Sequence, residues 1–248
     1  MKVAAMTGLI QLSSRLLDSM VVDNKHIPSS IGYAAVLNGL RKAKKLTLLQ
    51  KAMLDLSITC KETNQSLDTV ALNIYIGAIC DFATIPSTNA NYSQSDFLRE
   101  ALDLFLPNVA NDRYAIRDGP DTVSYNTMLN FALSSKPRNS TLATEMIELM
   151  RSNGIAGDIY TYNMRLKACG YSGQMAVAEK ILIIDEILSH PAVIPDKFTI
   201  EQALIPLASE GRIGDILELL KNFNSQQGSM ASKSNAYSTF LIALVKVG

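Results

Sequence analysis

Apolar residues recur at helical spacing through the middle of the chain, in two adjacent stretches that follow one plan. The first begins with VSYNTMLNFAL at Val123, where apolar side chains at i, i+3, i+4 and i+7 fall on one stripe of an α-helix. A polar stretch over residues 134–140 interrupts the pattern, and the same offsets return before Gly154, a residue suited to closing a helix. The pattern predicts two helices joined by a turn, with apolar stripes of Tyr125, Met128, Leu129 and Ala132, then Ala143, Met146, Ile147 and Met150.

The second stretch, YTYNMRLKACG from Tyr160, repeats this plan. Its first helix is predicted from the spacing of Tyr162, Leu166 and Cys169, and glycines at 170 and 173 supply the turn. The second helix has Ala178, Ile181 and Leu182 on its apolar face. An aspartate precedes each first helix, where its carboxylate can accept the unpaired N–H groups of the first turn; these residues are Asp121, Asp158 and Asp196.

Weaker copies of the same plan cover the rest of the sequence. They predict an all-α fold, a solenoid (α–α superhelix) of helix-turn-helix repeats that forms a single array over residues 1–248. Degenerate helices are expected over residues 1–30. Each two-helix unit is too short to bury its own apolar stripe, so stacking of neighbours is expected to stabilise the array. The repeats are predicted to start near Ile31, Val70, Val123, Tyr160 and Phe198, with a partial repeat over 235–248.

Two polar stretches, 84–95 and 107–120, make the second repeat longer than its neighbours. Insertions in a solenoid project from one side at little entropic cost, so both are predicted to be surface loops; the alternative is that one forms a docking element. Pro206 lies inside the first helix of the fifth repeat, where the missing backbone donor predicts a kink or a shortened helix.

The two ends of the chain leave open how much of the array it contains. Residues 1–20 carry Lys2 and Arg15 with no acid before Asp18, a composition compatible with an organellar presequence. Their apolar spacing instead favours the second helix of a degenerate repeat, which would place the start of the chain inside a larger solenoid. At the other end, residues 235–248 match only a first helix and its turn.

Composition excludes several classes of function. The 23 basic and 23 acidic residues cancel, so net charge gives no support for a polyanion partner, and charge must be judged locally. Cys60, Cys80 and Cys169 are widely separated and the chain has two histidines, which argues against a disulfide framework or a metal site. The longest apolar run, 70–80, is far shorter than the ~20 residues of a membrane-spanning helix.

Candidate catalytic groups are few. No phosphate-binding loop, nucleophile elbow or zinc-protease motif is present. The carboxylates of Asp185 and Glu186, and of Glu145 and Glu148, lie on second helices, where charged pairs usually form the solvated face. Cys169 reads as a buried small residue. We therefore expect no enzymatic activity, no cofactor and no metal.

The two clear copies resemble the pentatricopeptide repeat, a family of degenerate helix-turn-helix repeats. The resemblance rests on VSYNTML at Val123, YTYNMRL at Tyr160, the Gly-x-Ala-x-Asp and Pro-Asp turns before the next repeat, and the small-residue turn at Gly173. The tetratricopeptide repeat is excluded because its tryptophan signature is missing. The resemblance implies a right-handed superhelix with first helices on the concave face, single-stranded RNA as partner and a mitochondrial or plastid location.

In this family the fifth residue of each repeat and the last residue before the next repeat read the base, and the second residue flanks it. In the register that begins at Ile31, the fifth residues are Ala35, Ile74, Thr127, Met164, Gln202 and Thr239. The last residues are Thr69, Thr122, Ile159, Lys197 and Ser234, and the flanking positions include Ser124, Thr161 and Thr199. The family's usual readers are Thr, Ser or Asn paired with Asp, Asn or Ser. No repeat has such a pair in this register, which predicts weak or absent sequence reading.

Local charge gives RNA a second means of attachment. Between Asp23 and Asp55 the chain has six basic residues and no acid, and Arg165 and Lys167 could extend this track. Phosphate neutralisation there would give salt-dependent affinity without base selectivity, although a solvated helix end explains the same pattern. The predicted phosphate patch is Arg41, Lys42, Lys44 and Lys45.

RNA binding is therefore the leading hypothesis. A protein-interaction scaffold, for example within a ribonucleoprotein, is the alternative, and neutral net charge, aliphatic reading positions and uneven repeat lengths favour it. The two hypotheses predict different surfaces: basic side chains beside the fifth residues for an RNA reader, and an apolar patch for a scaffold.

Overall fold

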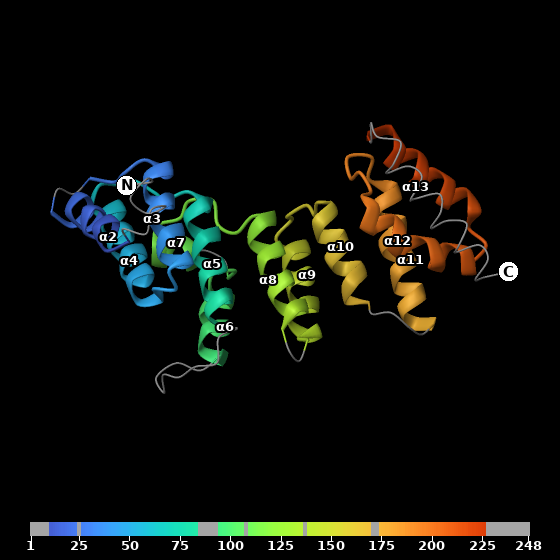
Figure 1. Ribbon diagram of the computed structural model, residues 1–248, viewed down its shortest axis with the longest axis horizontal. Coiled ribbons are helices and arrows are strands. Elements are labelled where there is room, and N and C mark those ends of the chain that lie inside the picture. Colours follow the sequence, from blue (N-terminus) through green and yellow to red (C-terminus); the bar gives the residue numbers. More distant parts are fainter. Residues whose placement is uncertain are drawn as a thin grey trace. The chain divides into compact units, whose positions relative to one another are not determined.

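A computed structural model describes residues 10–23, 26–83, 94–106, 109–135, 138–169 and 174–226 (Figure 1). Over these ranges the chain forms twelve α-helices and one five-residue π-helix, and strands are absent from them. The only β-type pairing within the described ranges is an isolated bridge between Leu67 and Ile116. The predicted all-α helical-repeat fold is confirmed.

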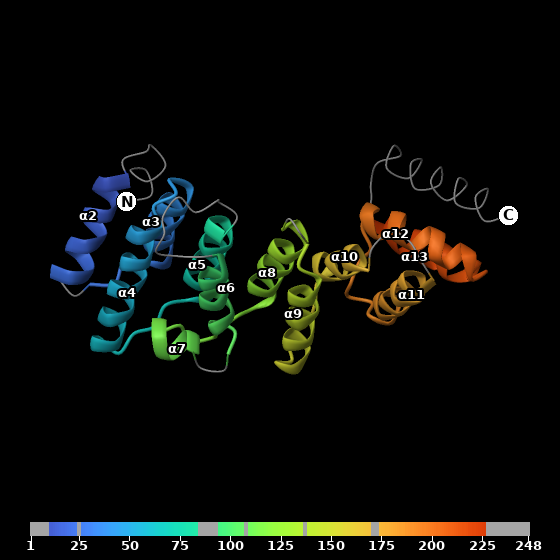
Figure 2. The ribbon, with the colours of Figure 1, turned by 90° about the horizontal axis from the view of Figure 1, so that it is seen from below.

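The chain divides into two compact units, the first of which covers residues 1–155. In this unit the first helices of successive repeats, α3, α5 and α8, pack on one another, while α4 packs on α3, α6 on α5 and α9 on α8. The pairing of α5 with α6 and of α8 with α9 can be followed in Figures 1 and 2. The helices are α2 Ile10–Asp18, η1 Ser19–Asp23, α3 Ser30–Lys42, α4 Leu46–Glu62, α5 Thr69–Ala83, α6 Gln94–Asp103, α7 Val109–Tyr114, α8 Thr122–Ser134 and α9 Ser140–Ser152.

The second unit covers residues 156–248 and contains four described helices. Helices α10 and α12 pack side by side, with α11 against both and α13 against α12. One apolar cluster fills this unit, in which Leu166, Ile184, Ala203 and Leu207 are fully buried. The helices are α10 Ile159–Ala168, α11 Gln174–Ser189, α12 Lys197–Ser209 and α13 Ile213–Gln226.

Side-chain caps fix where the first helices begin. Ser29 caps α3, and Asp121, Asp158 and Asp196 cap α8, α10 and α12 in capping boxes with the residue three positions later. Each first helix starts one residue before the start predicted from apolar spacing, at Ser30, Thr69, Thr122, Ile159 and Lys197. The predicted partial repeat at 235–248 lies outside the described residues.

Two local predictions from the sequence need correction. From residue 109 on, the stretch predicted to be a surface loop contains α7, and Tyr114, Ala115 and Ile116 are buried because they pack against the preceding repeat. Helix α12 continues through Pro206 to Ser209, so the shortened helix does not occur. The other polar stretch falls outside the described residues as far as residue 93, and α6 begins at Gln94.

Candidate nucleic-acid interface

A large apolar side chain is exposed at the second residue of four first helices. Ile31 is 70% exposed, Val70 47%, Val123 55% and Tyr160 43%. The i, i+4, i+7 and i+11 positions that share a helical stripe with this residue are also mostly open to solvent in α3 and α8. In α3 and α8 the stripe that begins with this apolar residue is therefore mostly accessible from solvent, and in α5 and α10 the second residue itself is exposed.

A polar cluster links successive first helices in the first unit. The Asn73 amide Nδ2 on α5 donates to Asp121 Oδ1 at 3.1 Å, and its carbonyl oxygen accepts from the Ser124 hydroxyl on α8. Asp121 Oδ1 also accepts from the Ser124 backbone N–H at 3.0 Å, as the helix cap. One asparagine side chain thus forms hydrogen bonds with both residues of the α8 cap and joins the two helices.

The second unit repeats this cluster. Asn163 Nδ2 on α10 donates to Asp196 Oδ2 at 2.8 Å, and Asn163 Oδ1 accepts from the Thr199 hydroxyl at 2.8 Å. Thr199 N–H and hydroxyl both reach Asp196 Oδ1, at 2.9 and 3.0 Å. We call these two sets, Asn73–Asp121–Ser124 and Asn163–Asp196–Thr199, the amide clusters.

The amide clusters retain unused hydrogen-bonding capacity. A carboxamide has two N–H donors and two carbonyl lone pairs, of which each cluster engages one donor and one lone pair. Because the ionised carboxylate can only accept and the hydroxyl already donates to the carbonyl, the orientation of the amide is fixed. Each amide therefore keeps a second N–H donor next to the carboxylate acceptor.

The predicted base-reading positions lie next to these clusters, with few free polar groups. Ile74 is buried, Thr127 donates its hydroxyl to Val123 O, and Gln202 accepts from Lys180 Nζ at 3.1 Å. Ala35 and Met164 are half-buried. Among the predicted last residues, Thr69, Thr122 and Ile159 begin their helices and Lys197 pairs with Glu201; Ser234 and Thr239 lie outside the described residues.

The predicted flanking residues Ser124, Thr161 and Thr199 are buried, because each forms the reciprocal half of a capping box. Their side chains are committed to the helix caps. They therefore act on a ligand only through the aspartates they hold.

The predicted phosphate patch divides into one paired and three open cations. Arg41 Nε donates to Asp81 Oδ2 at 2.6 Å, and its guanidinium lies over Gly77 on α5, where a Cβ would stand 2.3 Å from Nη1. Lys42, Lys44 and Lys45 are exposed around the α3–α4 turn.

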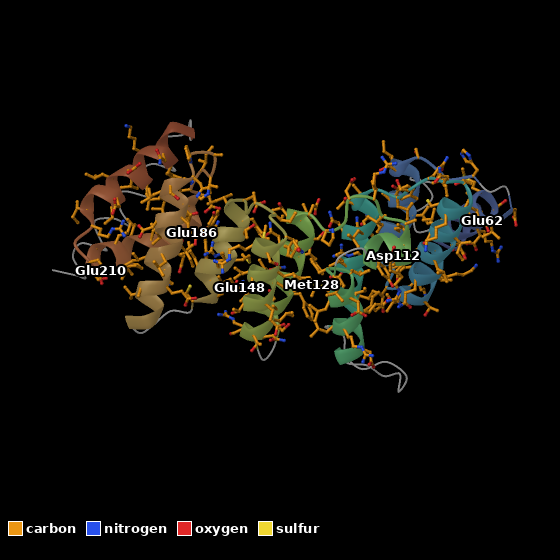
Figure 3. The ribbon with its side chains drawn as sticks, turned by 180° about the vertical axis from the view of Figure 1, so that it is seen from behind. Glu62, Asp112, Met128, Glu148, Glu186 and Glu210 are labelled. Atoms are coloured by element: carbon orange, nitrogen blue, oxygen red, sulfur yellow. The ribbon has the colours of Figure 1, made fainter. Side chains whose placement is uncertain are left out.

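In the second unit, Arg165 does not extend the basic track. It forms a two-pronged ion pair with Glu186, labelled in Figure 3, and stacks over the Tyr162 ring at 5.4 Å.

Other reactive groups are buried or paired. Burial raises the pKa of the Cys80 thiol to about 12 and that of Cys169 to about 11, so neither is an activated nucleophile. Asp185 pairs with Arg212 at 2.6 Å. The described part of the chain contains no cluster of His, Cys, Asp and Glu that could hold a metal, and none of its helices meets the length and hydropathy of a membrane span.

Comparison with protein families supplies the decisive observation. Residues 117–172 match the model of the pentatricopeptide repeat domain, over α8, α9 and α10. Residues 117–172 are thus similar to a pentatricopeptide repeat domain. Pentatricopeptide repeats are generally non-catalytic helical repeats. Comparison with curated proteins gives no significant match.

The caps define a register for the helical repeats that differs from the one based on apolar spacing. Counted from the first residue of each first helix, the fifth residues are Ala34, Asn73, Asn126, Asn163 and Glu201, and the last residues before the next repeat are Asp68, Asp121, Asp158 and Asp196. The exposed residues Ile31, Val70, Val123 and Tyr160 become the second residues. The recurring Asp-x-x-Ser/Thr pattern could have revealed this register from the sequence.

Proposed function

We propose that this chain is a non-catalytic pentatricopeptide repeat protein that binds single-stranded RNA along the exposed N-terminal turns of its first helices. A role in organellar RNA processing, stability or translation, in a mitochondrion or plastid, follows from the same family. The observation that carries the proposal is the amide cluster, because it pairs the asparagine at the fifth position with the aspartate that ends the same repeat. Asn paired with Asp is among the reader combinations that the family uses.

In the cap-based register the fifth, last and second positions of a repeat all carry the kinds of residue that the family has there. It places polar readers at the fifth and last positions and an exposed apolar residue at the second, where it would flank a base. The register counted from Ile31 instead gives Ile74 and Met164, which cannot make directional hydrogen bonds to base edges. We adopt the cap-based register for this reason, with Asn73 and Asn163 as readers.

The chemistry of the amide clusters favours particular bases. An N–H donor beside a carboxylate acceptor complements a base edge that offers a carbonyl oxygen next to an N–H group. Uracil and guanine have such an edge, whereas adenine and cytosine present an unprotonated ring nitrogen there. We therefore expect each amide cluster to prefer uracil or guanine.

Lys42, Lys44 and Lys45 supply the electrostatic part of the proposed interface. Lys42 falls on the helical stripe of Ile31, Ala35 and Asn38, so it faces the same side of α3 as the flanking residue. Each phosphate neutralised on a single strand contributes about −0.7 to the slope of log affinity against log salt. Arg41 contributes less because Asp81 already neutralises it.

A protein-interaction scaffold is the second candidate. The exposed apolar residues at the starts of α3, α5 and α8, Ile31, Val70 and Val123, are the observation that favours it, since such groups also suit a protein partner.

The test measures binding of the full chain to labelled single-stranded RNA homopolymers at several salt concentrations. We expect affinity for poly(U) or poly(G) to exceed that for poly(A) and poly(C). Asn163→Ser keeps a hydrogen-bonding group and should change the base preference, while the neighbouring change Met164→Ser should not. A well-folded protein that binds none of the four polymers at low salt contradicts the proposal and favours the scaffold.

A further inference from the structure

A long connection precedes Asp121, the carboxylate of the first amide cluster. In the second unit, residues 190–196 alone connect α11 to the cap of α12. In the first unit, residues 104–121 connect α6 to α8, and Asp121 is the last of them. A connection of that length would leave Asp121 loosely placed if nothing held it. It is instead attached to the preceding repeats at three successive levels.

The first level joins α7 to α4. Ser57 donates its hydroxyl to Arg113 O at 2.9 Å, and Lys61 Nζ donates to Asp112 O. Asp112, labelled in Figure 3, marks the position of α7 beside the green and blue helices of the first unit. These bonds satisfy carbonyls at the end of a six-residue helix that is too short to be stable alone.

The second level is a buried aromatic pair. The Tyr114 ring meets Tyr75 of α5 edge to face at 5.1 Å, and the Tyr114 hydroxyl donates to the Tyr75 hydroxyl at 3.0 Å. Tyr75 in turn donates to Glu100 of α6, which also accepts from Gln50 of α4 at 3.3 Å. Burial raises the pKa of both tyrosines, so both hydroxyls stay protonated and available as donors.

The third level runs along the backbone toward Asp121. Leu67 N–H donates to Ala115 O at 2.9 Å and Arg117 N–H to Leu67 O at 3.4 Å, while the Thr69 hydroxyl reaches Gly119 O at 3.4 Å. Ala115 adopts a left-handed conformation with φ of 52°, a strained geometry for alanine that the surrounding contacts must hold. Leu67 lies two residues before Thr69, the first residue of α5, so this bridge sits at the start of the helix that carries Asn73.

We propose that docked α7 is the positioning element of the Asn73–Asp121 reading site, with Tyr114 as its main positioning residue. This inference rests on the proposed function. The dock fixes the backbone that ends in Asp121, so the carboxylate meets the Asn73 amide already ordered, and RNA binding need not pay the entropy of ordering that connection. The Asn163–Asp196 site has no such insertion and serves as an internal reference.

The test compares Tyr114→Leu and Tyr114→Phe in the full chain with Leu142→Ala, a buried change on α9 in the same unit. Binding is measured to RNAs in which one nucleotide at a time is replaced, first at the position sensitive to Asn73→Ser and then at that sensitive to Asn163→Ser. We expect Tyr114→Leu to lower base discrimination at the first position at least about fivefold and leave the second unchanged. Tyr114→Phe, which keeps the ring contact, should retain most of it. An equal effect at both positions, or none at either, overturns the inference.

Hydrogen exchange of the free protein tests the dock without RNA. In Tyr114→Leu the amides of Leu67, Arg117 and Ser124 should exchange at least about tenfold faster than in the wild type, while those of α10 and α12 keep their rates. Unchanged protection of Ser124 N–H, which bonds the Asp121 carboxylate, overturns the positioning role whatever the RNA result. If the dock loosens as expected but the wild type binds no RNA, the proposed function fails, and with it the reading role assigned to the site.

Discussion

Replacing Asn163 with alanine removes the side chain that joins α10 to α12. In the wild type this 5% exposed amide donates to Asp196 and accepts from Thr199, which connects the two helices near their first turns. We expect the variant to fold, because the apolar cluster around Leu166 and Leu207 is untouched. The loss should appear as local loosening between the two helices.

The magnitude follows from the two bonds lost. A hydrogen bond to a charged group contributes about 1.5–3 kcal/mol and a neutral one about 0.5–1.5 kcal/mol. Asp196 is exposed, so water replaces its lost partner, and Thr199 keeps its bond to Asp196 Oδ1 at 3.0 Å. The smaller values therefore apply, and we expect a loss of about 2 kcal/mol, equivalent to roughly 30-fold faster opening.

Hydrogen exchange followed by mass spectrometry is the suitable assay, because the chain has two units and global unfolding need not be two-state. Peptides from α10 and α12 should exchange roughly 30-fold faster in Asn163→Ala, and peptides from α3 and α5 should be unchanged. Less than a twofold change in α10 and α12 would refute the role of the amide in holding these helices together.

The isosteric change Asn163→Asp separates packing from charge. It keeps the side-chain shape but places a second carboxylate against Asp196, where the wild-type amide nitrogen lies 2.8 Å away. Two carboxylates at that distance repel, so protection at pH 7 should fall below that of Asn163→Ala. Acidification that protonates one of them restores a donor, and the deficit should shrink as the pH falls. A deficit independent of pH contradicts this account.

Two further predictions concern the first unit. In Gly77→Ala the new Cβ would displace the Arg41 guanidinium from Asp81. The loss of this partly exposed ion pair costs at most about 1 kcal/mol and is offset by a similar gain in helix propensity. The free energy of unfolding measured in urea should therefore change by less than about 0.5 kcal/mol, and a loss above about 1.5 kcal/mol would contradict this prediction. Burial raises the pKa of the Cys80 thiol from 9.0 to about 12, so above pH 9 the thiol ionises in the unfolded state while it stays protonated in the folded state. The contribution of Cys80 to the free energy of unfolding should therefore be constant below pH 9 and fall by about 1.4 kcal/mol per pH unit above it. Cys80→Ala should remove this contribution from the pH dependence of stability measured by urea denaturation at alkaline pH.

Apolar periodicity predicted the buried stripe of α8 correctly but not that of α11, where Ala178 and Leu182 of the predicted apolar face are exposed and Ile183, Ile184 and Ile187 are buried instead. Tyr125, Met128, Leu129 and Ala132, spaced at i, i+3, i+4 and i+7, are all buried in α8. The aspartates placed before the first helices from their sequence also proved to be caps. These features are local, so a short window of sequence contains the physical cause.

The register could not be set by the same reasoning. Periodicity marks the side chains that repeat along a helix but not the residue at which the helix begins, and Val123 and Tyr160 are apolar residues that were counted as the first of their repeats although both are exposed. The cap decides the start, because its carboxylate bonds the N–H three residues on. One residue of difference moves the fifth position from Thr127 to Asn126.

The packing of α7 against α4 and α5 could not be predicted from the sequence, because the residues that hold it are distant in the chain. Residues 107–120 are polar enough to suggest a loop, but the partners of Tyr114 and Ile116 are Tyr75 and Leu67, about 40 to 50 residues earlier in the chain. Such pairings become visible only when the helices are in place.

The amide clusters tie stability and recognition to the same atoms. The asparagine that would read a base is also the side chain that fastens one first helix to the cap of the next, so the reading geometry is set by inter-repeat packing before any ligand arrives. A change that loosens the joint should therefore lower affinity, whereas a change that keeps a hydrogen-bonding group there but removes the second amide donor should shift base preference. For this reason Asn163→Ser with an altered preference carries more weight than any loss of binding in Asn163→Ala.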